Sequence, residues 1–210
     1  MGEEAAEGMF YLYNVGAKIF VTNNTPSETD INKATLWTAS RSDKRFSFTD
    51  EKGNLVITMN SLSANITEKG LFTIVTKFGL EPGTTEGKGN AYKLAYSQLL
   101  LQTRYFNVDK DKYTPETTPG DLNDWLFISE VQKNAYTEYV DLFNKAKSYT
   151  EAGSKLFESK DYEKTDAIVK QINDALKSYN YNTYEDGGKA KLKAAIKAAE
   201  DFITTGINEI

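Results

Sequence analysis

The sequence predicts an α+β protein with an all-β first half and a helical second half. Short segments rich in aromatic and β-branched residues recur at intervals of about ten residues up to residue 128, which is typical of antiparallel strands. From Ser129 onward, apolar residues recur at three- and four-residue steps, which is typical of helices. We therefore expect an all-β domain over residues 9–128 and a three-helix bundle over residues 129–210.

Ten segments of the first half have strand character, and Gly16, Gly53, Gly70 and Gly79 lie in turns between them. The segments are 10–15, 18–22, 35–40, 45–49, 55–59, 63–67, 71–76, 92–96, 99–103 and 125–129. All four prolines and ten of the 14 glycines precede residue 129, so turn-forming residues are concentrated in this half. Many short strands with no helical periodicity predict a sandwich or a barrel.

The second half begins with a helix-start signal. Ser129 followed by Gln132 is the pattern of a capping box. Three apolar stripes follow: Tyr139, Leu142, Phe143, Ala146 and Tyr149; then Ile168, Ile172, Ala175, Leu176 and Tyr179; then Leu192, Ala195, Ile196, Ala199, Ile203 and Ile207. Each stripe covers one helical face, and the short connections between them make neighbouring helices antiparallel.

The first half also contains an internal repeat. The segments 11–15, 18–22 and 36–38 have counterparts in 92–96, 99–103 and 125–127, and a fainter middle copy runs through 55–59, 63–67 and 71–75. Three copies of a strand, a hairpin strand and a closing strand predict a β-trefoil barrel. Trp37 and Trp125 take equivalent positions in this repeat, so we expect both indoles to be buried core residues.

Three runs of sequence carry a resemblance to a known family. The runs YLYNVGAKIFVTNN (11–24), LWTAS (36–40) and NDWLFISEVQKNAY (123–136) resemble secreted proteins of gut Bacteroidetes that have a ricin-type β-trefoil domain. The helical tail is similar to small three-helix modules found beside carbohydrate-active domains. The resemblance covers residues 9–135 and implies a secreted or cell-surface protein that handles glycans, its leader absent from this sequence.

The sugar-binding residues of that family cannot be carried over one by one. Ricin-type repeats end in Gln-x-Trp, whereas Trp37 follows Thr35 and Leu36, and Trp125 follows Asn123 and Asp124. The candidate ligand-binding residues are instead aromatic and polar side chains of a segment expected to be a loop after residue 101: Tyr105, Phe106, Asn107, Asp109, Asp111 and Tyr113. Aromatic rings there could stack on a pyranose while the polar groups bind hydroxyls; an ordinary solvated loop is the competing interpretation.

Composition excludes several kinds of chemistry. With no His and no Cys, the chain has no imidazole base, no thiolate nucleophile and no Cys/His zinc site. Asn107, Asp109 and Asp111 alternate like the start of a calcium loop, but Lys112 replaces the turn glycine and Thr118 the closing glutamate, so no metal site is expected. No cofactor is expected either.

Charge and hydropathy limit the partners. A net charge of -5 argues against a nucleic-acid ligand. No apolar run approaches the roughly 20 residues of a membrane-spanning helix. The expected partners are therefore a glycan or another protein.

These observations favour a non-catalytic extracellular carbohydrate-binding or surface-interaction module rather than an enzyme. The alternative is a structural or adaptor protein that binds a protein partner through its helical bundle. A carboxylate-based hydrolase is a third hypothesis, and it would need two facing acids in a pocket. Asp121 and Asp124 form one of several acid pairs, and none of these pairs has a distinctive spacing.

Overall fold

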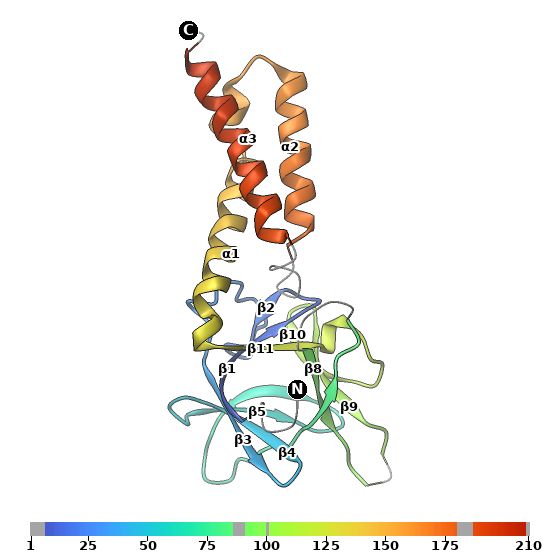
Figure 1. Cartoon of the computed structure of the whole chain (residues 1–210). Coiled ribbons are helices and arrows are strands. Elements are labelled where there is room, and N and C mark those ends of the chain that lie inside the picture. The colour runs from blue at the N-terminus through green and yellow to red at the C-terminus, as the bar shows by residue number, and fades with distance from the viewer. Residues whose placement is uncertain (1–6, 86–90, 100, 180–186, 209–210) are drawn as a thin grey trace. The chain divides into compact units, whose positions relative to one another are not determined.

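The computed structural model describes residues 7–85, 91–99, 101–179 and 187–208 (Figure 1). The chain divides into two compact units, Met1–Asn134 and Ala135–Ile210. The first is built from strands and the second from helices. The predicted α+β class, with a β-rich N-terminal part and a helical C-terminal part, is confirmed.

The strands of the first unit form one antiparallel 11-stranded sheet within the described residues. They are β1 (Gly8–Asn14), β2 (Ile19–Phe20), β3 (Trp37–Ser42), β4 (Arg45–Asp50), β5 (Leu55–Met59), β6 (Ala64–Glu68), β7 (Gly79–Pro82), β8 (Ala91–Tyr96), β9 (Arg104–Asp109), β10 (Lys112–Glu116) and β11 (Trp125–Ser129). A short 3-10 helix, η2 (Asp121–Asn123), precedes β11. The strands 55–59 and 125–129 have the predicted bounds.

Six of these strands close a ring. β1 pairs with β3 and with β11, β3 pairs with β4, and β8 pairs with β7 and with β11. The bridge between Phe46 and Phe78 joins β4 to the start of β7 and completes the circuit. The strands of the hairpins β5–β6 and β9–β10 pair with each other outside this ring. This arrangement is that of a β-trefoil-like barrel.

The pairing register repeats three times around the ring. The equivalent pairs are Phe10 with Trp37, Phe46 with Phe78, and Tyr92 with Trp125. The second member of each pair, Trp37, Phe78 or Trp125, is fully buried. The prediction that both tryptophans occupy equivalent core positions is confirmed, and Phe78 is their counterpart in the middle repeat.

The predicted strand over 71–76 is wrong. Leu71 and Phe72 are 100% and 95% exposed, and the strand of this repeat is β7, which follows Phe78. The apolar pair forms the corner of a tight turn because the hydroxyl of Thr73 accepts a hydrogen bond from the backbone N–H of Gly70 at 2.8 Å. Residues 71–76 are mostly apolar, but apolar and polar residues do not alternate along them as they do in a half-buried strand.

The predicted strand over 99–103 is also wrong. Leu99 and Leu101 are exposed, and the strand begins only at Arg104. The side chains of Phe106 and Val108, two residues apart, point into the core and set the register of β9. The segment expected to be a loop is therefore the β9–β10 hairpin.

The second unit contains the helices that follow β11, apart from the start of the first of them before Ala135. They are α1 (Glu130–Ser148), η3 (Lys155–Glu158), α2 (Tyr162–Lys177) and α3 (Gly188–Asn208). The predicted capping box precedes α1: the backbone N–H of Ser129 donates to Gln132 Oε1 at 3.0 Å, and the N–H of Gln132 donates to Ser129 Oγ at 3.4 Å. None of the described helices is long and apolar enough to cross a membrane.

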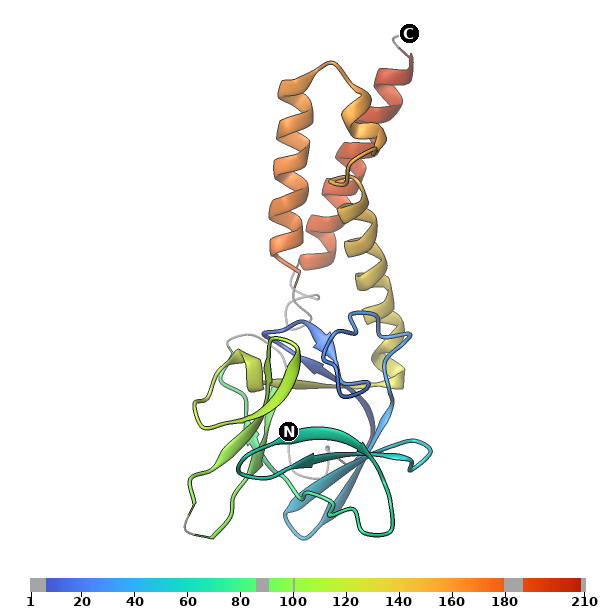
Figure 2. The ribbon, with the colours of Figure 1, turned by 180° about the vertical axis from the view of Figure 1, so that it is seen from behind.

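The predicted apolar stripes form the core of the helical unit. Tyr179 packs against Tyr139 and Phe143, with ring centroids 4.6 and 4.2 Å apart. The fully or nearly fully buried stripe residues are Tyr139, Ala146, Ile172, Ala175, Tyr179, Leu192, Ala195, Ile196 and Ala199. Ile207 lies outside the residues whose side chains are described. Helices α2 and α3 run side by side in both views (Figures 1 and 2).

Candidate ligand-binding site

The sequence-predicted aromatics of the β9–β10 hairpin are core residues. Phe106 is fully buried, and Tyr113 is 4% exposed. Their rings stack with centroids 4.9 Å apart and an interplanar angle of 17°. The expectation that they are exposed is wrong, because both alternate inward along their strands and face Trp125. Neither ring has a free face to offer a sugar.

The predicted polar residues of this segment lie in different surroundings. Asn107 is buried, and its amide donates to the backbone oxygen of Val108 at 3.0 Å. Asp109 and Asp111 are exposed where the hairpin turns. Tyr105 is half-buried, and its hydroxyl donates to Glu81 at 3.0 Å. The six residues do not converge on one site, and ligand binding by Tyr105, Asp109 or Asp111 stays a prediction.

A buried ion pair lies nearby and was not predicted. Lys93 and Asp124 are 2% and 0% exposed, and their charged atoms are 2.5 Å apart. The ammonium of Lys93 also donates to Asn123 Oδ1 at 2.6 Å and to the backbone oxygen of Gly120 at 2.9 Å. The pair joins β8 to the segment that precedes β11.

The carboxylate of Asp124 is saturated with donors. It accepts the backbone N–H of Thr84 at 3.0 Å, and the N–H and hydroxyl of Thr85 at 2.7 and 2.5 Å. Burial alone would raise the pKa of Asp124, but Lys93 and the Thr85 donors outweigh it and hold this pKa below its ordinary value. Asp121 is exposed. The ion pair of Lys93 and Asp124 therefore has a structural role. Asp121 and Asp124 are not two facing acids of the kind that a hydrolase needs.

The first unit has a hollow of about 400 Å³ in its middle repeat, a size typical of small-molecule sites. We call it the middle-repeat cleft. It is lined by Arg45, Thr58, Met59, Asn60, Ser63, Asn65, Ile74, Val75, Thr76, Lys77 and Tyr96. The side chains come from the start of β4, the β5–β6 hairpin, the segment before β7 and the end of β8.

Two sets of hydrogen bonds hold the walls of the cleft in place. Asn60 Oδ1 accepts the backbone N–H groups of Leu62 and Ser63 at 2.8 and 2.9 Å, which fixes the β5–β6 turn. The hydroxyl of Thr76 accepts the N–H of Met59 at 2.7 Å and donates to the oxygen of the same residue at 3.0 Å. The segment before β7 is thereby tied to the end of β5. The backbone that shapes the cleft is preorganised.

Several polar groups of the cleft are left for a ligand. Within the described residues, the Nδ2 group of Asn60 and the side-chain amide of Asn65 make no hydrogen bond, and Arg45 forms no ion pair. Tyr96 adds a half-buried ring. The lining contains two cations and no carboxylate. Ile74, which is 86% exposed, adds an apolar edge.

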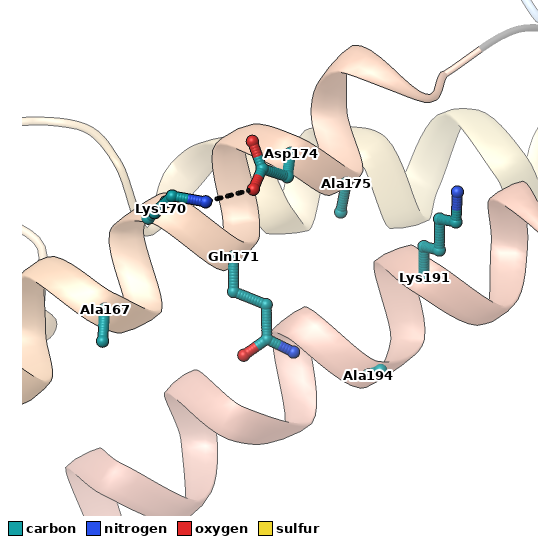
Figure 3. A pocket seen from close by; sticks show the side chains of 7 residues that line it. All are labelled: Ala167, Lys170, Gln171, Asp174, Ala175, Lys191 and Ala194. Carbon is teal, nitrogen blue, oxygen red and sulfur yellow. Dashed lines mark hydrogen bonds and ion pairs between the residues drawn. The ribbon is translucent and has the colours of Figure 1, made fainter.

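The hollow between α2 and α3 has fewer groups that could bind a ligand. It is lined by Ala167, Lys170, Gln171, Asp174, Ala175, Lys191 and Ala194 (Figure 3). The ammonium of Lys170 is paired with Asp174 at 2.9 Å, as the dashed line marks. The lining has no aromatic ring, and three of its side chains are alanines.

A third hollow lies where the helical unit brings Tyr149, Lys155 and Glu200 together. The carboxylate of Glu200 is already engaged by Lys145 at 2.6 Å and by the hydroxyl of Tyr149 at 3.3 Å. Of these three hollows, the middle-repeat cleft is the one in which a half-buried ring lies beside two asparagine amide groups that make no hydrogen bond within the described residues. Sequence reasoning missed it because its walls come from four separate segments of the chain.

The fold places the chain in the class of β-trefoil-like barrels followed by three helices. No protein-family model matches the sequence, and no curated protein matches it. One similar solved structure is that of SeviL bound to asialo-GM1 saccharide. It has a TM-score of 0.47 and 11% sequence identity, and the match covers 59% of this chain and 98% of that chain.

Proposed function

We propose that this chain is a non-catalytic carbohydrate-binding module and that the middle-repeat cleft is its binding site. The observation that carries the proposal is the set of unused hydrogen-bonding groups in the cleft beside the ring of Tyr96. Saccharides present many hydroxyls on a ring with apolar faces. Asn60 and Asn65 can donate to hydroxyl oxygens while Tyr96 packs on a pyranose face.

The expected affinity is weak. The cleft is open to solvent along the exposed Ile74, and a sugar must give up its hydration to enter. We expect useful binding to polysaccharides that present many copies of the ligand. Measurements should therefore use polymers or arrayed glycans.

The alternative of a protein adaptor acting through the helical bundle needs a contiguous apolar face on that unit. Among the described residues of α1, η3, α2 and α3, the large hydrophobic side chains that are exposed are Val131, near the start of α1, Phe157, in η3, and Tyr162, at the start of α2. They do not line up along one helix. This observation favours the cleft over the bundle as the site of function.

Affinity electrophoresis through gels that contain plant or host polysaccharides, together with a glycan array, tests the proposal. We expect Asn65→Ala and Tyr96→Ala to weaken binding about fivefold or more, since each removes a direct contact. Asn32→Ala is a matched control, because Asn32 is exposed and lies outside the cleft.

Tyr105→Ala tests the earlier sequence-predicted site against the cleft. We expect this variant to bind like the unmodified protein. Loss of binding in Tyr105→Ala with full binding in Asn65→Ala would move the site to the β9–β10 hairpin. An absence of binding across all the glycans and polysaccharides would overturn the proposed function.

A further inference from the structure

The charge of the middle-repeat cleft is opposite to that of the whole protein. The chain carries a net charge of -5. The lining of the cleft contains Arg45 and Lys77 and no Asp or Glu. A local excess of positive charge on an acidic protein raises the concentration of anionic ligands at that place.

The two cations are not neutralised by the protein. Arg45 forms no ion pair within the described residues, and the ammonium of Lys77 donates a hydrogen bond to the neutral hydroxyl of Ser42, at 3.1 Å. By contrast, Lys189 and Lys193 are both neutralised by ion pairs with Glu138, at 2.5 and 2.8 Å. The charges of Arg45 and Lys77 remain available to a ligand.

Hydrogen bonding in the cleft favours the same kind of ligand. The oxygen of the Asn60 side chain is occupied by the β5–β6 turn, so this residue offers its Nδ2 donor to the cleft. The guanidinium of Arg45 and the ammonium of Lys77 are donors without acceptor capacity. The side chains therefore present more donors than acceptors. A carboxylate or sulfate group, which only accepts hydrogen bonds when ionised, matches this set.

We propose that the middle-repeat cleft selects acidic saccharides, in which a sugar ring carries a carboxylate or a sulfate. The inference rests on the proposed function and names its ligand class. The anionic group binds between Arg45 and Lys77, and the sugar ring lies against Tyr96 and the asparagines. The fork of Arg45 suits two oxygens of one anionic group.

The test compares polymers that share a backbone and differ in charge. Polygalacturonate is compared with its fully methyl-esterified form, and dextran sulfate with dextran, so that the two arms separate carboxylate from sulfate. We expect binding to at least one charged polymer and about tenfold weaker binding to its neutral partner. We also expect that binding to weaken as sodium chloride rises from about 50 mM to about 500 mM.

Substitutions of the two cations in the cleft test whether charged polymers bind at this site. Arg45→Gln and Lys77→Gln should each weaken binding to the charged polymer about three- to tenfold. Lys44→Gln is the matched control, since it removes the same charge one residue away from Arg45 and outside the lining. Poly-glutamate, an anion without a sugar ring, should bind far more weakly than the charged polysaccharide.

The outcomes separate this inference from the proposed function. Binding to a neutral polysaccharide that is lost in Asn65→Ala and unchanged in Arg45→Gln would overturn the acidic-ligand inference and keep the carbohydrate site. Binding of poly-glutamate as strong as that of the charged polysaccharide would also overturn it. Failure to bind any saccharide, charged or neutral, would overturn both.

Discussion

Trp37 and Trp125 make the same hydrogen bond in two different repeats of the barrel. The indole N–H of Trp37 donates to the backbone oxygen of Val21 at 2.9 Å, and that of Trp125 donates to the oxygen of Phe106 at 2.8 Å. Both side chains are fully buried. Phe78 holds the third equivalent position and has no such donor. In the middle repeat, the equivalent position therefore holds a buried aromatic ring that makes no side-chain hydrogen bond.

The first prediction follows from this shared bond. Trp37→Phe and Trp125→Phe should each lower the free energy of unfolding of the first unit by about 1–3 kcal/mol, because a buried carbonyl loses its donor. Each variant retains the other tryptophan, and both lie in the first unit, so urea unfolding followed by fluorescence reports this unit alone. Unchanged midpoints would show that the indole bonds add nothing to packing.

The second prediction concerns the buried pair of Lys93 and Asp124. Lys93→Met leaves a carboxylate without its cation and should cost about 3–5 kcal/mol in the first unit. The double variant Lys93→Met with Asp124→Leu should cost less than the sum of the two single changes, because no unpaired charge remains. Urea unfolding of the three variants gives the coupling energy.

An exposed ion pair provides the control for that experiment. Lys170 and Asp174 are 78% and 55% exposed and 2.9 Å apart. Lys170→Met should change the stability of the helical unit by less than about 0.5 kcal/mol. Equal costs at Lys93 and Lys170 would contradict the claim that burial makes the first pair important.

The third prediction is a pH dependence of the helical unit. Hydrogen bonds from Lys189 and Lys193 lower the pKa of Glu138 from about 4.5 to about 2. A carboxyl with a lowered pKa stabilises the fold above its unfolded pKa and loses that contribution as pH falls through the folded value. The helical unit should therefore lose stability between pH 4.5 and pH 2.

Circular dichroism melts of Glu138→Gln test this pH dependence. The variant should show a smaller loss on acidification, and the difference should stay below about 1 kcal/mol because all three side chains contact solvent. Glu151→Gln is the control, since Glu151 is exposed in the turn after α1. An unchanged acid profile in Glu138→Gln would exclude the two lysine contacts as its cause.

Local signals in the sequence predicted local structure well. The Ser129 and Gln132 pattern became a capping box because both partners lie within one turn of chain. Alternation and register placed Trp37 and Trp125 correctly in the core. Apolar density alone failed at Leu71 and Phe72, where the hydroxyl of Thr73 holds a turn and the two side chains stay in water.

The sites depend on contacts that the sequence does not make visible. Lys93 and Asp124 are 31 residues apart, and neither has a neighbour in sequence that marks it as buried. The cleft joins Arg45, the β5–β6 hairpin, Lys77 and Tyr96, which meet only when the barrel closes. The loop-like composition around Tyr105 predicted a ligand-binding site in this segment. The segment is instead a hairpin, and the rings of Phe106 and Tyr113 pack in the core.

The last prediction concerns the hydroxyl of Tyr113. This group is buried and makes no hydrogen bond within the described residues, while its ring stacks on Phe106. Tyr113→Phe removes a desolvated polar group and keeps the stack, so stability at neutral pH should stay the same or rise by up to about 1 kcal/mol. Tyr113→Ala removes the ring and should cost about 3–5 kcal/mol.

Alkaline pH distinguishes the hydroxyl from the ring. Burial raises the pKa of Tyr113 far above its ordinary value, so the folded state keeps this group neutral. As pH rises above the unfolded pKa of about 10, this group ionises in the unfolded state but not in the folded one, so the folded state loses stability relative to the unfolded state. Tyr113→Phe should therefore unfold less readily than the unmodified protein between pH 10 and pH 12, as measured by urea unfolding at each pH. A lower stability of Tyr113→Phe at neutral pH, by more than about 1 kcal/mol, would mean that the hydroxyl has a partner that stabilises the fold.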